Sequence, residues 1–183
     1  KRVVFQGVEG AYSFGAMKEF FDDTITSFHV DTWKEAMEAI TKGEADYAVL
    51  PIENSTAGIV SDIYDLLVEY PHYIVGEQEL PVEHVLMALP GAKVEDIRTV
   101  ISHPQALAQC RRFLDSNENW KTEERLNTAA AAKEVSESGD LTMAAVGSPY
   151  AAEHFGLQIL KEGIFDAWGN TCLLYTSPSP RDS

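Results

Sequence analysis

The segment TWKEAMEAITKGEADYAVL, residues 32–50, decides the fold because its periodicity changes once along its length. Apolar residues recur at helical spacing in its first half: Trp33, Ala36, Met37 and Ile40. After Gly43 the spacing is lost, and the apolar run Tyr47–Leu50 is typical of a buried strand. A helix that leads into a buried strand is the building unit of α/β proteins with a central sheet.

The same scheme returns about 96 residues later in the sequence. Residues 128–135 form a second helical pattern, which Gly139 and the strand Met143–Val146 follow. Upstream, the apolar run at 3–5 precedes a polar loop and a helical pattern, and residues 97–114 repeat that order. Chance similarity between two α/β segments stays open, but the shared order predicts an α/β protein with two lobes, each a central sheet flanked by helices.

We expect lobe one to span residues 1–77 together with a returning C-terminal segment, and lobe two to span residues 78–155. The stretch Val75–Leu80 is expected to lead out of lobe one, and a helix near Ala151–Leu160 is expected to carry the chain back. In open α/β sheets ligands bind beyond the carboxyl ends of the strands. The sequence therefore predicts an active site in a cleft between the lobes.

Composition excludes several classes of function. The chain has 183 residues, 45% of them hydrophobic, which is enough for one sizeable core or two adjoining ones. A formal net charge of -15 argues against nucleic-acid binding. No apolar run is long enough to cross a bilayer and no signal segment is evident, so we expect a cytoplasmic protein without membrane contact. The two cysteines, Cys110 and Cys172, indicate neither a disulfide framework nor a thiolate metal site.

Polar side chains gather in loops after predicted strands and at one predicted helix start. The loop Pro51–Gly58 contains a carboxylate, an amide, two hydroxyls and a glycine, a set that suits an oxyanion, although spacing alone favours Ser55 or Thr56 as the cap of the next helix. Ser102 could donate to a carboxylate, and His103 could be a general acid or base or a helix cap. Thr128 is predicted to cap the helix that follows it. The loop at 7–10 lacks a dinucleotide or phosphate-loop fingerprint, so neither NAD nor ATP is expected.

Five motifs in order resemble the prephenate dehydratase family over residues 3–170. They are Gly7-x-x-Gly10-x-Tyr12-Ser13; Ala39-Ile40-x-x-Gly43-x-Ala45-Asp46-Tyr47-Ala48 running into Pro51-Ile52-Glu53-Asn54-Ser55-x-x-Gly58; Ser102-His103-Pro104-Gln105-Ala106-x-x-Gln109-Cys110; Thr128-Ala129-x-Ala131; and Tyr150-Ala151-Ala152-x-x-Phe155-Gly156-Leu157. Such a co-linear set is far more specific than any single motif.

The resemblance implies a two-lobed fold like that of periplasmic binding proteins and a lyase of L-phenylalanine biosynthesis. Such a lyase converts prephenate to phenylpyruvate with loss of water and carbon dioxide, and needs neither a cofactor nor a metal. It further implies substrate-binding roles for Asn54, Ser55, Ser102 and Thr128, and supporting roles for Ser13, Glu53, His103, Gln105 and Asn170. Family members act as homo-oligomers, usually dimers, in the cytoplasm, or in the plastid of photosynthetic eukaryotes.

The end of the chain departs from the family pattern. The family's catalytic Thr-Arg-Phe corresponds here to Cys172, Leu173 and Leu174, so no catalytic residue is retained with certainty. The catalytic domain is expected to span residues 1–174, and the Pro- and Ser-rich stretch 175–183 to be a disordered tail that resembles translated vector sequence. We therefore expect impaired activity. The open alternatives are an arogenate dehydratase and a binding protein for small anions without catalysis.

Overall fold

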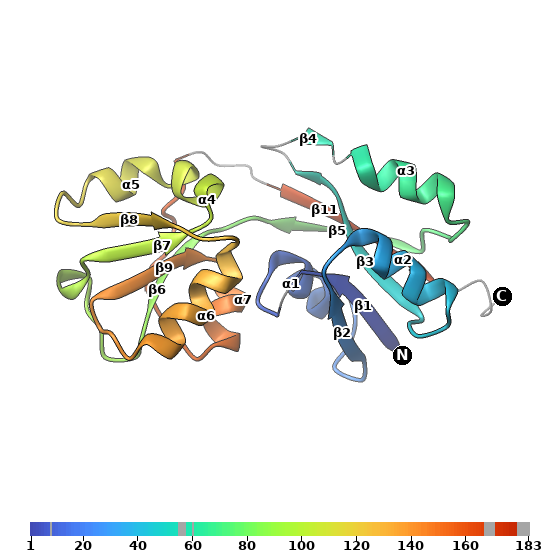
Figure 1. Cartoon of the computed structure of the whole chain (residues 1–183), viewed down its shortest axis with the longest axis horizontal. Helices are drawn as coiled ribbons and strands as arrows, with labels where there is room; N and C mark the ends of the chain where they lie inside the picture. Colours follow the sequence, from blue (N-terminus) through green and yellow to red (C-terminus); the bar gives the residue numbers. More distant parts are fainter. Residues whose placement is uncertain (8, 55–57, 60, 167–170, 179–183) are drawn as a thin grey trace. The chain divides into compact units, whose positions relative to one another are not determined.

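The computed structural model describes residues 1–7, 9–54, 58–59, 61–166 and 171–178, and the chain divides into two compact units, each with its own sheet (Figure 1). Unit 1 comprises the described residues within 1–8, 12–82 and 169–183, and unit 2 those within 9–11 and 83–168. The boundaries thus fall at residues 82 and 168 rather than near residues 77 and 155. Within the described part, no helix is long and apolar enough to cross a membrane.

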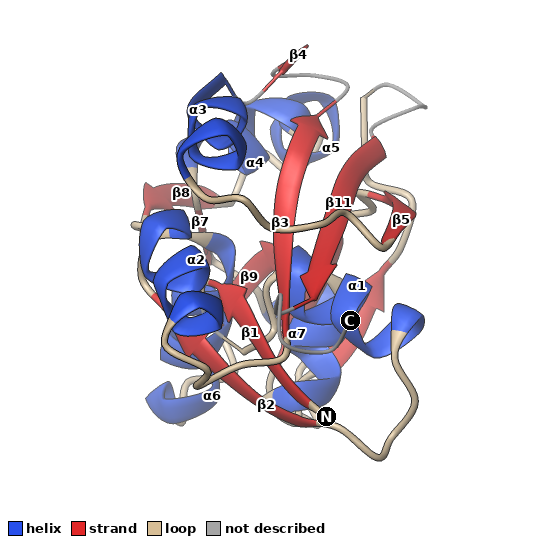
Figure 2. Ribbon diagram, turned by 90° about the vertical axis from the view of Figure 1, so that its right-hand side faces the viewer, coloured by secondary structure: helices blue, strands red, loops and turns tan. Residues whose placement is uncertain are grey.

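Unit 1 is built around a sheet with the strand order β2-β1-β3-β11-β5, and β4 pairs with the end of β3. Its strands are β1 (Arg2–Gln6), β2 (Thr26–Val30), β3 (Tyr47–Asn54), β4 (Gly58–Ile59), β5 (Gly76–Pro81) and β11 (Thr171–Pro178). Its helices are α1 (Tyr12–Phe20), α2 (Trp33–Thr41) and α3 (Ser61–Glu69). Strand β1 runs parallel to β2 and β3, whereas β11 runs antiparallel to β3 and β5. Figure 2 shows the opposed arrowheads of β3 and β11.

Alternation along the strands of unit 1 divides its apolar side chains between two faces. Val4 of β1 and Leu50 of β3 pack with Met37 and Ile40 of α2 and Ile63 of α3 in one buried cluster. On β1 the neighbouring residue Phe5 points the other way, and its ring lies 5.5 Å from that of Phe14 in α1. The sheet is therefore covered by α2 and α3 on one face and by α1 on the other.

Unit 2 has the strand order β10-β6-β9-β7-β8. Its strands are β6 (Val85–Ala88), β7 (Thr99–Ser102), β8 (Lys121–Glu124), β9 (Met143–Gly147) and β10 (Gln158–Lys161). Its helices are the 3-10 turn η1 (Val94–Asp96), α4 (Pro104–Gln109), α5 (Arg111–Asp115), α6 (Thr128–Ser138) and α7 (Pro149–His154). Strand β7 runs parallel to β8 and β9, and β6 runs antiparallel to β9 and β10.

Unit 2 also has two apolar faces. Val100 and Val146 pack with Leu107 and Leu114 of α4 and α5. The other face of the sheet packs against α6 and α7, through Val85, Met87, Ile101 and Ala145. The predicted α/β class, with each sheet flanked by helices, is confirmed.

The two units repeat one pairing scheme. Val3 of β1 pairs with Tyr47 of β3, and Thr99 of β7 pairs with Met143 of β9, both in parallel. In each unit the strand after the first helical segment, β2 or β8, pairs on the opposite side of the first strand. The predicted duplication is therefore present as a repeated strand order and register.

Two expectations about the connections are wrong. The helix near residues 151–160 does not carry the chain back, because α7 packs in the core of unit 2 and β10 pairs with β6 there. Residues 175–178 are not disordered, since they form the second half of β11 between β3 and β5. Strands pair through backbone N–H and C=O groups, and every residue except proline has both. A stretch without apolar alternation can therefore still form a strand between two others.

Candidate functional site

The parallel strands of unit 2 present three loops at one edge of the sheet. Strands β7, β8 and β9 run parallel and end at Ser102, Glu124 and Gly147. Helices α4, α6 and α7 each begin within four residues of these ends. The carboxyl ends of parallel strands are where α/β proteins bind ligands. Two of the predicted substrate-binding residues, Ser102 and Thr128, lie at this edge.

Thr128 lies against the end of β9. A Cβ atom added to Gly147 would stand 3.4 Å from Thr128 Cβ and 3.3 Å from Met87 Cε. That spacing is tight, so glycine lets the end of β9 pass close to the first residue of α6. Thr128 itself is half-buried. The sequence signal for Gly147 is the Gly-Ser-Pro run directly after a buried strand, which the sequence analysis did not use.

The prediction that Thr128 caps α6 is wrong, because the cap is Asn127. The Asn127 side chain accepts from the Ala130 N–H at 2.7 Å, and Thr128 occupies the first helical position. Asn and Thr are both good caps, so adjacent candidates cannot be separated by residue type alone. The shift leaves the Thr128 hydroxyl free of the capping role.

The N-termini of α6 and of its counterpart α2 differ in charge. In α2 a complete capping box is formed, because Thr32 accepts from Glu35 N at 3.2 Å and the Glu35 carboxylate accepts from Thr32 N at 3.0 Å. No acidic residue lies in the first turn of α6. The first N–H groups of a helix have no helical partner and attract negative charge. In α2 the Glu35 carboxylate, which accepts from the N–H groups of Asp31 and Thr32, places a negative charge beside the helix start, and α6 has no such charge in its first turn.

Ser102 makes a structural hydrogen bond, and its predicted substrate contact stays a prediction. Its side chain is fully buried, and its hydroxyl donates to Val146 O at 2.6 Å, which ties the end of β7 to β9. A hydroxyl has one hydrogen to donate, and a carboxylate needs donors. In this geometry the Ser102 hydroxyl cannot donate to a substrate carboxylate.

His103 caps α4, which was one of its two predicted roles. Its Nδ1 accepts from Gln105 N at 3.1 Å, and Pro104 occupies the first turn. The Gln105 side chain is exposed. In unit 1, Ser13 is buried and donates to Gln6 O at 2.7 Å, which fastens the start of α1 to the end of β1. The predicted supporting role of Ser13 in the reaction stays a prediction.

The segment at 9–11 belongs to unit 2, although the described residues on both sides of it belong to unit 1. Ser148 is fully buried, donates to Gly10 O at 2.7 Å and accepts from Ala151 N at 3.0 Å. Gly10 has φ +90°, and a Cβ atom there would stand 3.0 Å from Ala151 Cα. Both the backbone angle and the close approach require glycine.

The remaining predicted site residues cannot be placed. Ser55 and Asn170 lie outside the described residues, and the side chains of Glu53 and Asn54 are likewise not described. For β11 only the strand pairing is described, in which Cys172 is the partner of Asn54 on β3 and of Leu80 on β5.

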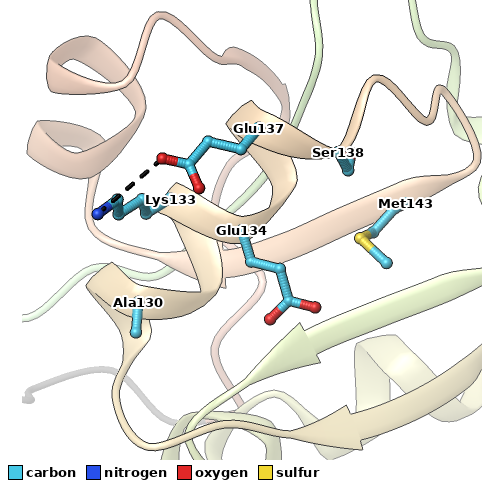
Figure 3. A pocket seen from close by; sticks show the side chains of 6 residues that line it. All are labelled: Ala130, Lys133, Glu134, Glu137, Ser138 and Met143. Atoms are coloured by element: carbon cyan, nitrogen blue, oxygen red, sulfur yellow. Dashed lines mark ion pairs between the residues drawn. The ribbon is translucent and has the colours of Figure 1, made fainter.

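A surface hollow of about 460 Å³ lies beside α6 (Figure 3). It is lined by Ala130, Lys133, Glu134, Glu137, Ser138 and Met143. The Lys133 ammonium pairs with Glu137 at 3.9 Å, and Glu134 accepts from Arg125 at 2.6 Å. Two carboxylates and one already paired ammonium do not suit an anionic substrate, so we do not place the substrate there.

Two buried titratable groups in unit 2 are held neutral. Burial lowers the pKa of His84, and a hydrogen bond with Gln109 partly opposes that effect. Burial, with Asp166 nearby, raises the pKa of the Cys110 thiol to about 12, so it is not a nucleophile near neutral pH. Among the side chains that the structure describes, no three His, Cys, Asp or Glu residues gather as a metal site.

Comparison with known proteins gives consistent matches. The family model described as prephenate dehydratase matches residues 3–172. A curated relative, arogenate dehydratase 1 of Petunia hybrida, is 44% identical over 170 residues, which are 92% of this chain and 40% of that protein.

Two solved structures share the fold over 98% of this chain. A protein described as GqqA, a novel type of quorum quenching acylase, is 37% identical with a TM-score of 0.89, and 64% of its chain is covered. A prephenate dehydratase from Arthrobacter aurescens in complex with L-Phe is 29% identical with a TM-score of 0.86, and 61% of its chain is covered.

Proposed function

This chain belongs to the prephenate dehydratase family, and from that premise we propose that it is the catalytic domain of a carbon–oxygen lyase that acts on prephenate. The product is phenylpyruvate, and the reaction serves L-phenylalanine biosynthesis. Because the chain spans only 40% of the Petunia relative, this activity is proposed for the domain and not for a longer protein. The observation that carries the proposal is the N-terminus of α6, which has no acidic residue in its first turn and has Thr128 at its first position, at the carboxyl edge of unit 2.

The chemistry requires few groups. The ring carboxylate leaves as carbon dioxide, its bonding electrons complete the aromatic ring, and the ring hydroxyl departs as water after it receives one proton. The enzyme must hold a dianion and protonate the hydroxyl. We assign the binding of one carboxylate to the Thr128 hydroxyl and the first N–H groups of α6, where the helix dipole favours negative charge.

The proton donor is altered in this chain. By family similarity, Cys172 stands at the position of the family's catalytic threonine and Leu173 at that of its arginine. A thiol is a weaker hydrogen-bond donor than a hydroxyl, and leucine provides no charge. We propose that these changes impair turnover while the anion site of unit 2 is kept.

The test is prephenate turnover by the chain and by the variant Cys172→Thr, Leu173→Arg, Leu174→Phe. We expect the triple variant to be faster by about 10²–10⁴-fold, the range for a positioned general acid. The single variant Leu174→Phe restores neither the donor nor the charge and is the matched control. Equal rates for the chain and the triple variant would contradict the proposal.

A second substrate is favoured by one observation, the 44% identity to a protein named arogenate dehydratase. Arogenate carries an amino group in place of the keto oxygen of prephenate. The same turnover assay with both substrates decides between them by the ratio of kcat/KM. Binding of phenylpyruvate without turnover of either substrate in the triple variant would identify a binding protein instead.

A further inference from the structure

The chain passes from unit 1 to unit 2 after residue 82 and returns after residue 168. Inside unit 2, next to these two passages, lie His84 and Phe165. The His84 side chain is 3% exposed, and its ring stacks on that of Phe165 with centroids 4.7 Å apart and planes 23° apart. The outgoing and the returning segments are therefore in direct contact within unit 2.

Gln109, the last residue of α4, binds both segments. Its side-chain oxygen lies 2.8 Å from His84 Nε2, and its backbone oxygen accepts from Asp166 N at 3.0 Å. An amide oxygen only accepts, so His84 Nε2 carries a hydrogen in this pair. Burial favours the neutral imidazole, and in that form the ring keeps its hydrogen on Nε2.

Asp166 closes the break between α4 and α5. Helix α4 ends at Gln109, and the next residue, Cys110, has φ -114° and ψ 17° and gives no side-chain cap to α5. Both carboxylate oxygens of Asp166 lie 3.1 Å from Arg112 N, the second residue of α5. The cap that a local side chain usually supplies comes here from the returning segment.

Ile164 completes the set, because it is 2% exposed and packs in the cluster of Leu107 and Leu114. Three successive residues are thus fixed by three kinds of contact: apolar burial for Ile164, ring stacking for Phe165 and hydrogen bonds for Asp166. We call His84, Gln109 and residues 164–166 the clasp.

Beyond the clasp, both segments enter the sheet of unit 1. Only Val82 and Glu83 separate His84 from Pro81 of β5, and Pro81 is the strand partner of Thr171, the first residue of β11. We propose that the clasp fixes the start of β11, and that His84 and Asp166 are positioning residues for the lyase reaction. The second part rests on the proposed function, since the family's proton donor corresponds to Cys172 of β11.

The first test is amide hydrogen exchange in the chain as it stands, with Phe165→Leu and Asp166→Ala. We expect the amides of β11 and β5 to exchange faster by on the order of tenfold, since each change removes one anchor of the returning segment. Asp166→Asn keeps an oxygen acceptor for Arg112 N and should retain most of the protection.

Matched controls exist elsewhere in unit 2. Asp140 accepts from Thr142 N at 2.8 Å, and Phe113 packs edge-on against Trp120 at 5.6 Å. Asp140→Ala and Phe113→Leu remove the same kinds of contact away from the passages. If the clasp variants accelerate exchange in β11 and β5 no more than these controls, the proposal is overturned.

The second test uses the chain with Thr-Arg-Phe restored. There Asp166→Ala should lower kcat for prephenate by more than it raises KM, because the clasp holds the start of β11, where the family's proton donor corresponds to Cys172. A change in KM alone would overturn the positioning role. If the restored chain shows no turnover, the proposed function fails, and the exchange measurement still decides whether the clasp holds β11.

Discussion

Units 1 and 2 share three parallel strands in the same register, yet they take their fourth strand from different places in the chain. In unit 2, β6 precedes the repeated strands and pairs with β9. In unit 1 the corresponding place beside β3 is filled by β11, more than 100 residues after the repeated strands end. Unit 2 can complete its sheet from contiguous sequence, whereas unit 1 depends on the return of the chain. That dependence explains why a clasp at the return segment matters.

The units differ again at the helix that follows the second strand. Glu35 closes the N-terminus of α2, and no carboxylate closes that of α6. Both helices have a side-chain cap, and they differ in the negative charge that Glu35 places at the start of α2. Anion binding at the start of α6 is our proposal for unit 2.

The largest expected effect separates the two cores. Ile40 of α2 and Val135 of α6 are buried against equivalent faces of the two sheets. Ile40→Ala should lower the free energy of unfolding of unit 1 by about 2–5 kcal/mol, and Val135→Ala that of unit 2 by somewhat less, since it removes less volume. Amide exchange measured residue by residue should show each loss mainly in its own unit. Equal losses in both units from either variant would mean that the units do not have separate cores.

A smaller effect is expected from the bond that closes the edge of unit 2. Ser102→Ala leaves the Val146 carbonyl without its hydroxyl partner in a fully buried position. We expect a loss of about 1–3 kcal/mol in the unfolding free energy, measured by urea denaturation. Thr24→Ala, at an exposed hydroxyl of unit 1, is the control and should cost little. If Ser102→Ala left the unfolding free energy unchanged, the Ser102 hydroxyl would remain a candidate substrate contact.

Ser102 also shows what the sequence could and could not predict. The α/β class and the repeated order of helix and strand follow from periodicity, and the structure confirms them; the strand register was not predicted. The direction of a side chain does not follow from periodicity. The offset of 96 residues between the two repeats places Ser102 opposite Gln6. The buried clusters instead make Ile101 the counterpart of Val4, which is an offset of 97 residues. A difference of one residue in the offset turns every side chain of a strand to the other face of the sheet. Ser102 then corresponds to the core residue Phe5, which accounts for its burial.

Side-chain partners that are distant in the sequence could not be predicted either. Nothing in the local pattern around Asp166 or His84 indicates that both meet at the end of α4. The cap of α6 was misplaced by one residue because Asn127 and Thr128 are equally suitable types. These errors concern which group a side chain contacts; strands without a clear apolar pattern, such as β2 and β8, were not predicted either.

The next effect, of similar or smaller size, concerns acid stability of unit 2. Burial lowers the pKa of His84 in the folded chain, so below the unfolded value of about 6.5 the unfolded state binds more protons than the folded state. The stabilisation by neutral His84 is present above that pH and is lost as the pH falls toward the folded value. His84→Gln should remove this part of the slope, seen as a smaller drop in unfolding free energy between pH 7 and pH 5. Unchanged slopes would show that His84 titrates alike in both states.

The smallest change in structure tests the central claim, that the N-terminus of α6 binds a substrate carboxylate. Ala130 occupies the position in α6 that Glu35 occupies in α2, so Ala130→Glu gives α6 a carboxylate at the third helical position. Ala130→Gln has nearly the same size without the charge and is the matched control.

The measurement is calorimetric titration of phenylpyruvate into the chain and both variants at low ionic strength. The account predicts that Ala130→Glu weakens binding by on the order of tenfold while Ala130→Gln changes it by less than about threefold, since a carboxylate there places a negative charge beside the proposed anion site. Equal affinities of the Glu and Gln variants would contradict it.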